Sequence, residues 1–323
     1  MKLTVKDVWM ARKRIHRVLP RTPLLHSASL SSFTGVPVYL KLEHLQPTGS
    51  FKLRGATNMI SSLTETEKKK GVATFSTGNH GFAVAHAAAN LGIRAVVCVS
   101  ERVPEAKIEA LKKSGADLHI EGESQDAAAE VCFRLQKEKG CVLIPPFDHP
   151  HIIAGQGTIG LEILEDLPEV KHVLGGLSGG GLLSGIGLAL KETDPAIRVT
   201  GLCVEKGAAM DESIQAGKPV NVPEHPTYAD SLLGGIGLHN RYTMPMVTRY
   251  VDKRLRLSDT TIAKGMAFLY DKHRLVVEGA AAVGAGALLD GLVRPEGPTV
   301  LVITGNSIDP RSHLEAVQPY VSL

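Results

Sequence analysis

The sequence predicts an α/β protein with two parallel-sheet lobes, the smaller lobe inserted in the larger. Short runs of β-branched and apolar residues alternate with segments of helical periodicity, and this alternation is typical of parallel sheets. The length of 323 residues exceeds one ordinary domain and allows two. Glycine is abundant, with 33 residues, which suits many tight turns around a ligand held between the lobes.

The expected elements and lobe boundaries follow from this alternation. The first part of the larger lobe covers 1–64, with a helix over 5–18, an extended lead-in over 19–24 and a strand over 38–42. The small lobe covers 65–145, with strands over 71–75, 95–99, 118–121 and 141–144 and helices over 81–91, 104–114 and 124–139. The second part of the larger lobe covers 146–323, with helices over 159–164, 182–191, 259–273 and 280–289 and strands over 170–177, 198–204 and 300–304.

Composition and charge exclude several classes of function. The net charge of +3 is too small to argue for nucleic acid, and the basic run over 68–70 follows two glutamates, as at a solvated helix end. No apolar run approaches the ~18 residues that a membrane span needs, and the N-terminus has no apolar signal segment. The cysteines show no metal-type or redox-type spacing, so we expect buried thiols in a reducing, cytoplasmic environment. They are Cys98, Cys132, Cys141 and Cys203.

Lys52 stands in the first turn of a predicted helix. Pro47 and Gly49 break any regular element before it, and Ser50 is the predicted N-cap because apolar residues recur at helical spacing from Phe51 onward. The positive end of the helix dipole disfavours a cation there and favours the neutral amine. Such a lysine can act as a covalent nucleophile toward a carbonyl. A surface lysine with a solvated head is the alternative from this segment alone.

Two loops follow predicted strands and open predicted helices. The loop over 76–81 reads Ser-Thr-Gly-Asn-His-Gly, and its hydroxyls and backbone N–H groups suit an anion; a simple helix cap is the alternative. The loop over 175–182 reads Gly-Gly-Leu-Ser-Gly-Gly-Gly-Leu, and its glycines let several amides approach one phosphate. It meets the dinucleotide spacing only loosely and lacks the Lys-Ser/Thr pair of a P-loop. A tight turn that needs small residues is its alternative.

Two weaker patterns complete the set. Glu205 and Asp211, with an intervening backbone carbonyl, offer oxygen ligands that suit a hard cation such as Mg²⁺ or Ca²⁺. Solvated loop acids are the alternative there. The final predicted strand ends in Thr304, followed by Gly-Asn-Ser, where an ordinary strand-end turn is the alternative.

Together these patterns resemble the motifs of fold type II pyridoxal phosphate enzymes, the serine/threonine dehydratase and serine racemase group. The segment over 50–56, Ser-Phe-Lys-Leu-Arg-Gly-Ala, is similar to the lysine motif of that family, and the two loops are similar to its substrate and phosphate loops. Matching motifs reach from Thr22 to Asp309, which is nearly the whole chain. The resemblance implies the tryptophan synthase β-like fold and pyridoxal 5'-phosphate as the cofactor, and it makes Mg²⁺ or Ca²⁺ a candidate second cofactor.

The resemblance also implies which residues hold pyridoxal 5'-phosphate. Lys52 binds it covalently and acts as a base, and Asn79 hydrogen-bonds its ring hydroxyl. Thr304 places a hydroxyl against the ring nitrogen, and a hydroxyl, unlike a carboxylate, favours elimination over transamination. The remaining implied cofactor contacts are Phe51, Ser178, Gly179, Gly180, Gly181, Leu182 and Glu278.

The resemblance implies substrate contacts and metal ligands as well. The implied substrate contacts are Ser76, Thr77, Gly78, His80 and Asp230. Thr77 stands where racemases carry a serine as acid/base and where many dehydratases carry alanine, so it is the second candidate catalytic residue beside Lys52. The metal ligands implied by the family spacing are Glu205, Ala209 and Asp211.

These roles imply a dehydratase, an ammonia-lyase, that converts a β-hydroxy amino acid such as threonine or serine to a 2-oxo acid and ammonium. The segments over 124–126 and 230–238 look most like hydroxyectoine-utilisation dehydratases, which adds a hydroxyectoine-derived amino acid as a substrate. A serine or aspartate racemase is the alternative within the family. A non-catalytic binding module for a phosphorylated ligand is the alternative outside it. We expect a homodimer that acts on a small amino acid.

Overall fold

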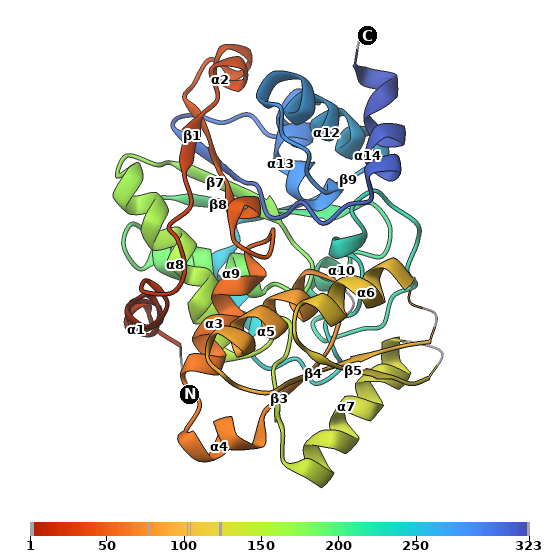
Figure 1. The fold of residues 1–323 in the computed structure, drawn as a ribbon. Coiled ribbons are helices and arrows are strands. Elements are labelled where there is room, and N and C mark those ends of the chain that lie inside the picture. Colours follow the sequence, from red (N-terminus) through yellow and green to blue (C-terminus); the bar gives the residue numbers. More distant parts are fainter. Residues whose placement is uncertain (1–2, 77, 102, 104, 123–124, 322–323) are drawn as a thin grey trace.

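The computed structural model of the chain describes residues 3–321 except 77, 102, 104, 123 and 124. Thr77, Pro104 and Ser124, which belong to predicted sites or elements, lie outside the described residues. The described chain contains a six-stranded and a four-stranded sheet, and the smaller sheet lies in the lower part of Figure 1. Within this described part, no helix is both long and apolar enough to cross a membrane.

The larger sheet has the strand order β1-β2-β10-β7-β8-β9. Its strands are β1 (Leu24–His26), β2 (Val38–Lys41), β7 (His172–Gly176), β8 (Arg198–Val204), β9 (Lys253–Leu257) and β10 (Thr299–Val302). The smaller sheet has the order β5-β4-β3-β6. Its strands are β3 (Val72–Phe75), β4 (Ala95–Val99), β5 (Asp117–Ile120) and β6 (Val142–Leu143). All neighbouring strands described are parallel except β1 and β2, so the predicted α/β fold with two parallel-sheet lobes is confirmed.

Helices connect and cover the strands (Figure 1). The α-helices are α1 (Val5–Ile15), α2 (Ala28–Thr34), α3 (Lys52–Ser61), α4 (Glu65–Lys70), α5 (Asn79–Asn90), α6 (Glu105–Lys113), α7 (Gln125–Lys139), α8 (Pro150–Asp166), α9 (Gly181–Lys191), α10 (Ala209–Ala216), α11 (Thr243–Tyr250), α12 (Asp259–His273), α13 (Gly279–Leu289) and α14 (Pro310–Val317). Short 3₁₀ turns are η1 (Glu43–Leu45), η2 (Asp230–Leu232) and η3 (Gln318–Tyr320). The cysteines are buried and free of disulfides, as predicted. The lobe boundaries at 64/65 and 145/146 stay a prediction.

The largest difference from the predicted elements is α8, which begins at Pro150 although the prediction starts at 159. Its early turns contain glycines, which lower helix propensity and hide the helix from a periodicity argument. One of them explains the helix: a Cβ on Gly155 would lie 2.6 Å from the Cα of Gly55 in α3. Close backbone packing of α8 on α3 thus stabilises a segment that is a weak helix by itself. Helices α2, α10, α11 and α14 and strand β9 are further elements that the sequence does not predict.

The predicted N-cap at Ser50 is wrong, because α3 begins at Lys52 and its cap residue is Phe51. Ser50 instead forms an isolated bridge with Gly305. The N–H of Phe51 donates to the carbonyl of Thr304 at 3.0 Å. The start of α3 is therefore tied to the segment that follows β10, which brings Lys52 and Thr304 to one corner of the fold.

A buried charge cluster lies behind the start of α3 and consists of Lys41, Glu43, Arg54 and Glu162. The Arg54 guanidinium makes two hydrogen bonds to each glutamate, all between 2.7 and 2.8 Å. The ammonium of Lys41 donates to Glu162 at 2.7 Å. Two cations and two anions thus balance one another, and the planar guanidinium fork holds the first turn of α3 in one orientation.

Candidate active site

The predicted cofactor residues Asn79 and Glu278 meet across the two lobes. Asn79 opens α5 directly after the loop that follows β3, and Glu278 is the N-cap of α13. The side-chain amide of Asn79 donates to the two carboxylate oxygens of Glu278 at 2.9 and 3.2 Å. The hydroxyl of Ser231, which the sequence did not indicate, donates to Glu278 at 3.2 Å. Three segments far apart in the sequence therefore converge on one carboxylate.

Glu278 is 3% exposed, and burial raises the pKa of its carboxyl to about 7. The nearby Asp230 carboxylate also raises this pKa, whereas the hydrogen bonds from Asn79 and Ser231 lower it. Asp230 itself is exposed at the start of η2. Glu278 is consequently poised to change its charge near neutral pH.

Lys52 is the first residue of α3, and it is half-buried. Its ammonium donates to the carbonyl of Pro146 at 2.9 Å and lies 5.4 Å from the centre of the Phe51 ring. Burial lowers the pKa of the amine to about 8, although the charge of Glu278 acts in the opposite direction. A far larger fraction of this amine is neutral at physiological pH than of a surface lysine, as attack on a carbonyl requires.

The lowered pKa of Lys52 predicts how covalent capture of a cofactor carbonyl depends on pH. Only the neutral amine attacks, so in the cofactor-free protein the rate should rise with pH and level off above about 8, not above the ordinary value of 10.5. Stopped-flow absorbance after mixing with pyridoxal 5'-phosphate measures this rate. Glu278→Gln removes the charge that raises this pKa, so its midpoint should move to lower pH. A midpoint near 10.5 in the unchanged protein contradicts the prediction.

The predicted substrate loop is anchored at its helical end. His80 is buried with its Nε2 2.9 Å from the carbonyl of Ile144. Burial, followed by the charge of Lys52, lowers the pKa of its imidazole to about 3. The ring is therefore neutral, and Nε2 donates because a carbonyl only accepts. A Cβ on Gly81 would collide with the carbonyl of Ser76, so the turn requires glycine at this position.

The tip of the same loop carries the two half-buried residues Ser76 and Gly78. The N–H of Gly78 donates to the hydroxyl of Ser76 at 3.4 Å. Thr77 lies between them, outside the described residues, so its catalytic role stays a prediction. The described part of the loop thus places the Ser76 hydroxyl close before the start of α5, and its role in a carboxylate site stays a prediction.

The glycine loop between β7 and α9 leaves no space for a side chain at Gly179 or Gly180. Gly180, with φ +83°, is the N-cap of α9, and a Cβ on it would lie 2.8 Å from Met210 Cε and from Val247 Cγ2. A Cβ on Gly179 would collide with the ring of Phe147. The first N–H groups of α9 have no intrahelical partner, and such groups bind anions well. The local geometry therefore suits a phosphate.

Other predicted members of the glycine loop have different surroundings. Gly181 is the first residue of α9, and Leu182 is buried in the hydrophobic core beside it. The hydroxyl of Ser178 donates to the carbonyl of Leu233 at 3.3 Å. Backbone amides, not the Ser178 hydroxyl, are thus the groups that this loop offers to a phosphate.

Two buried atoms at this corner, Thr304 Oγ1 and Asn79 Oδ1, have no hydrogen-bond partner among the residues that the structure describes. Buried polar atoms are almost always hydrogen-bonded in folded proteins, so both atoms are available to a polar group of a bound ligand or to a water molecule. Pyridoxal 5'-phosphate carries a carbonyl, a ring nitrogen, a ring hydroxyl and a phosphate. A neutral amine at Lys52, the two unpartnered atoms and the glycine loop fit these four groups.

The predicted metal ligands do not fit a divalent cation in the same way. Asp211 is buried, and its two oxygens accept hydrogen bonds from the Nε atoms of Arg254 and Arg256, both at 2.9 Å. Glu205 is exposed, and Ala209 is the first residue of α10. The described residues contain no group of three or more His, Cys, Asp or Glu side chains that could hold a metal ion.

The segment between β6 and α8 contributes to the site, although the sequence did not indicate it. Besides the Pro146 carbonyl and the Phe147 ring, it contains Asp148. The Asp148 carboxylate accepts hydrogen bonds from the N–H groups of Arg241, Tyr242 and Thr243 at 2.7, 2.8 and 2.8 Å. The paired prolines at 145 and 146 were the available signal, since they force an extended connection between the lobes.

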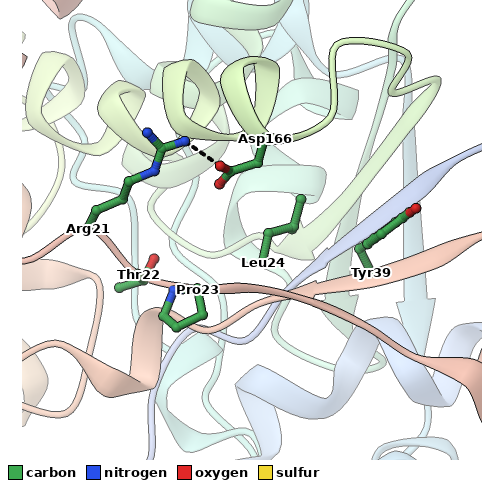
Figure 2. A pocket seen from close by; sticks show the side chains of 6 residues that line it. All are labelled: Arg21, Thr22, Pro23, Leu24, Tyr39 and Asp166. Atoms are coloured by element: carbon green, nitrogen blue, oxygen red, sulfur yellow. Dashed lines mark hydrogen bonds and ion pairs between the residues drawn. The ribbon is translucent and has the colours of Figure 1, made fainter.

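A surface pocket of about 380 Å³ lies apart from these residues, and Figure 2 shows its lining side chains. They are Arg21, Thr22, Pro23, Leu24, Tyr39 and Asp166. Arg21 and Asp166 form an ion pair across one wall of it. The lining includes no predicted site residue, so this pocket is separate from the candidate active site.

Comparisons with known proteins show the family and the fold of the chain. The family model described as "Pyridoxal-phosphate dependent enzyme" matches residues 15–305. A relative from Sinorhizobium fredii, provisionally named threonine dehydratase, is 47% identical over 99% of this chain and 96% of its own length. The L-threonine ammonia-lyase of Thermotoga maritima is 40% identical over 95% of this chain and 76% of its own. The structure of maize serine racemase superimposes with a TM-score of 0.91 at 32% identity, covering 99% of this chain and 98% of the racemase.

Proposed function

The chain belongs to the threonine dehydratase and serine racemase family of pyridoxal-phosphate-dependent enzymes, and from this premise we propose that it is an ammonia-lyase acting on threonine or serine. It would convert either amino acid to a 2-oxo acid and ammonium. The observation that carries the proposal is Thr304, whose buried hydroxyl has no hydrogen-bond partner in the described chain. A hydroxyl at the ring nitrogen favours elimination over transamination, because it does not stabilise a protonated ring.

When bound, pyridoxal 5'-phosphate withdraws electrons from the substrate Cα and makes its proton acidic. The amine of Lys52, with a pKa of about 8, can accept that proton at Nζ near neutral pH. The N–H groups at the start of α9 hold the phosphate, and Asn79 and Thr304 orient the ring by their polar atoms. Neutral His80 keeps the substrate loop in place through Ile144.

The relatives support lyase and racemase chemistry alike, so a serine racemase is the second candidate function. The narrower predictions stay part of the proposal: a hydroxyectoine-derived amino acid as substrate, a homodimer and a cytoplasmic location. The predicted cation at Glu205, Ala209 and Asp211 stays a prediction, and the two arginines on Asp211 argue against it. Release of 2-oxo acid from threonine, serine and the hydroxyectoine-derived amino acid ranks the substrates.

Variants at Thr77 separate a lyase from a racemase. Racemisation needs a second proton donor on the face of the substrate opposite Lys52, and the branched side chain of threonine restricts how its hydroxyl can turn. We expect L-serine to give mainly pyruvate, with D-serine as a minor product. Thr77→Ala should keep most of the elimination activity, and Thr77→Ser should gain racemisation.

Pyruvate and D-serine are measured together by chiral chromatography, with the unchanged protein as the control for both variants. If the unchanged protein makes D-serine faster than pyruvate, the lyase assignment is wrong and the racemase takes its place.

A further inference from the structure

Two arginines bind the carboxylate of Asp211, which the family resemblance assigns to a divalent cation. Asp211 lies in the first turn of α10, and its side chain is only 9% exposed. One oxygen accepts from Arg254 Nε at 2.9 Å, and the other accepts from Arg256 Nε and from Gln215 Nε2, both at 2.9 Å. Both carboxylate oxygens are therefore engaged by side chains of this chain.

The strand β9 explains how both guanidinium groups reach one carboxylate. Side chains two residues apart in a strand point to the same face, so Arg254 and Arg256 project together. They face α10 from the edge strand of the larger sheet. Their combined charge of +2 equals that of a divalent cation, and it is delivered to the same buried carboxylate.

A cation and the two guanidinium groups cannot share Asp211 without strong repulsion, because a divalent ion would bind the same oxygens at about 2.0–2.6 Å. We propose that Arg254 and Arg256 replace the divalent cation in this chain, so that neither its fold nor its glycine loop needs a metal. The part of this proposal that concerns the metal is independent of the proposed function.

The same contact reaches the glycine loop through the neighbouring residue. Met210 precedes Asp211. Its Cε lies 2.8 Å from the position that a Cβ on Gly180 would take. Met210 also shares a buried hydrophobic cluster with Leu182 and Val247. The arginine pair thus anchors α10 in the position from which Met210 packs against the loop. This step rests on the proposed function, because the loop is the proposed phosphate site.

The first measurement uses the unchanged holoenzyme. After treatment with EDTA, its thermal unfolding midpoint should be the same without added metal and with Mg²⁺ or Ca²⁺. Titration with Mn²⁺, followed by the electron paramagnetic resonance signal of the free ion, should show no specific binding. A fall of the midpoint with EDTA that Mg²⁺ reverses, or stoichiometric Mn²⁺ binding, overturns the proposal.

The second measurement removes the two charges, with Arg254→Gln/Arg256→Gln as the variant. A buried carboxylate left without its partners destabilises a fold, so the unfolding midpoint should fall and the variant should lose cofactor faster on dialysis. Mg²⁺ should raise the midpoint of this variant and slow that loss, because a ligand that binds the native state stabilises it. The control is Arg249→Gln/Lys253→Gln, which removes two charges from exposed positions nearby.

The possible outcomes separate the question of the metal from the proposed function. A folded double variant that gains no response to Mg²⁺ overturns the replacement of a cation by arginines. If the double variant does not fold, Arg256→Gln alone is tested in the same way, since the Arg256 side chain is 34% exposed. An unchanged protein that never retains pyridoxal 5'-phosphate would refute the proposed function, while its unfolding midpoint and Mn²⁺ titration would still decide the metal question.

Discussion

We expect the Lys52→Ala protein to lose covalent attachment of pyridoxal 5'-phosphate and to turn over at least about 10³-fold more slowly. Two functions are lost together, because the amine is both the point of attachment and the proposed base. A positioned acid or base alone contributes roughly 10²–10⁴-fold to a rate. The loss should be local, since Lys52 contacts Pro146 and Phe51 at the site.

The visible absorbance of the purified variant and its 2-oxo acid release from threonine test this expectation. Lys68→Ala is a suitable control, because Lys68 lies on the surface helix α4 and pairs with Glu65. The Lys52→Ala protein should keep the unfolding transition of the cofactor-free parent protein. Activity within roughly tenfold of the parent, a difference of only about 1.4 kcal/mol in the barrier, refutes the role of Lys52.

Gly180→Asp should give a folded protein that is largely free of cofactor. The residue has φ +83°, and its Cβ position lies 2.8 Å from Met210 and Val247 atoms, so any side chain strains the loop. The aspartate adds a negative charge beside a doubly charged phosphate. At 4 Å and an effective dielectric constant near 20, each pair of like charges costs about 4 kcal/mol. Cofactor affinity should therefore fall by about 10³-fold or more.

Gly180→Ala separates the two causes, because it brings the steric strain without the charge. Cofactor content after dialysis, read from absorbance and phosphate analysis, should decrease in the order parent, alanine, aspartate. Circular dichroism checks that both variants are folded. An aspartate variant that retains cofactor as the parent does would place the phosphate elsewhere in the molecule.

The fold could be predicted where local sequence signals and tertiary packing agree. Strand β8 and helix α12 have the predicted boundaries, and α12 begins with the side-chain cap of Ser258. Tertiary packing determines the elements that local sequence signals do not predict. The glycines of α8 weaken its helical pattern, yet they allow the close contact with α3 through Gly155. A contact between residues about a hundred positions apart is invisible to a periodicity argument.

The candidate site shows the same division. The glycine loop and Lys52 could be predicted, because each is a local pattern beside a predicted strand or helix end. The residues that contact those groups could not be predicted from the sequence. Asp211 has the spacing of a metal ligand, but its arginines come from β9, more than forty residues later and unpredicted from the sequence. Pro146 carries no reactive group, and only the fold brings its carbonyl to Lys52.

The buried charge cluster constrains how this sequence can change over successive generations. Removing one member, for example Glu43 or Lys41, leaves an uncompensated buried charge, and such a change costs about 3–5 kcal/mol. That is a large part of the whole stability of a typical domain. A replacement of the cluster by apolar residues must therefore pass through intermediates that fold poorly, even where the end point would be as stable. The residues at these four positions can therefore be replaced only together. Lys52, two residues before Arg54, is held in its position by the same constraint.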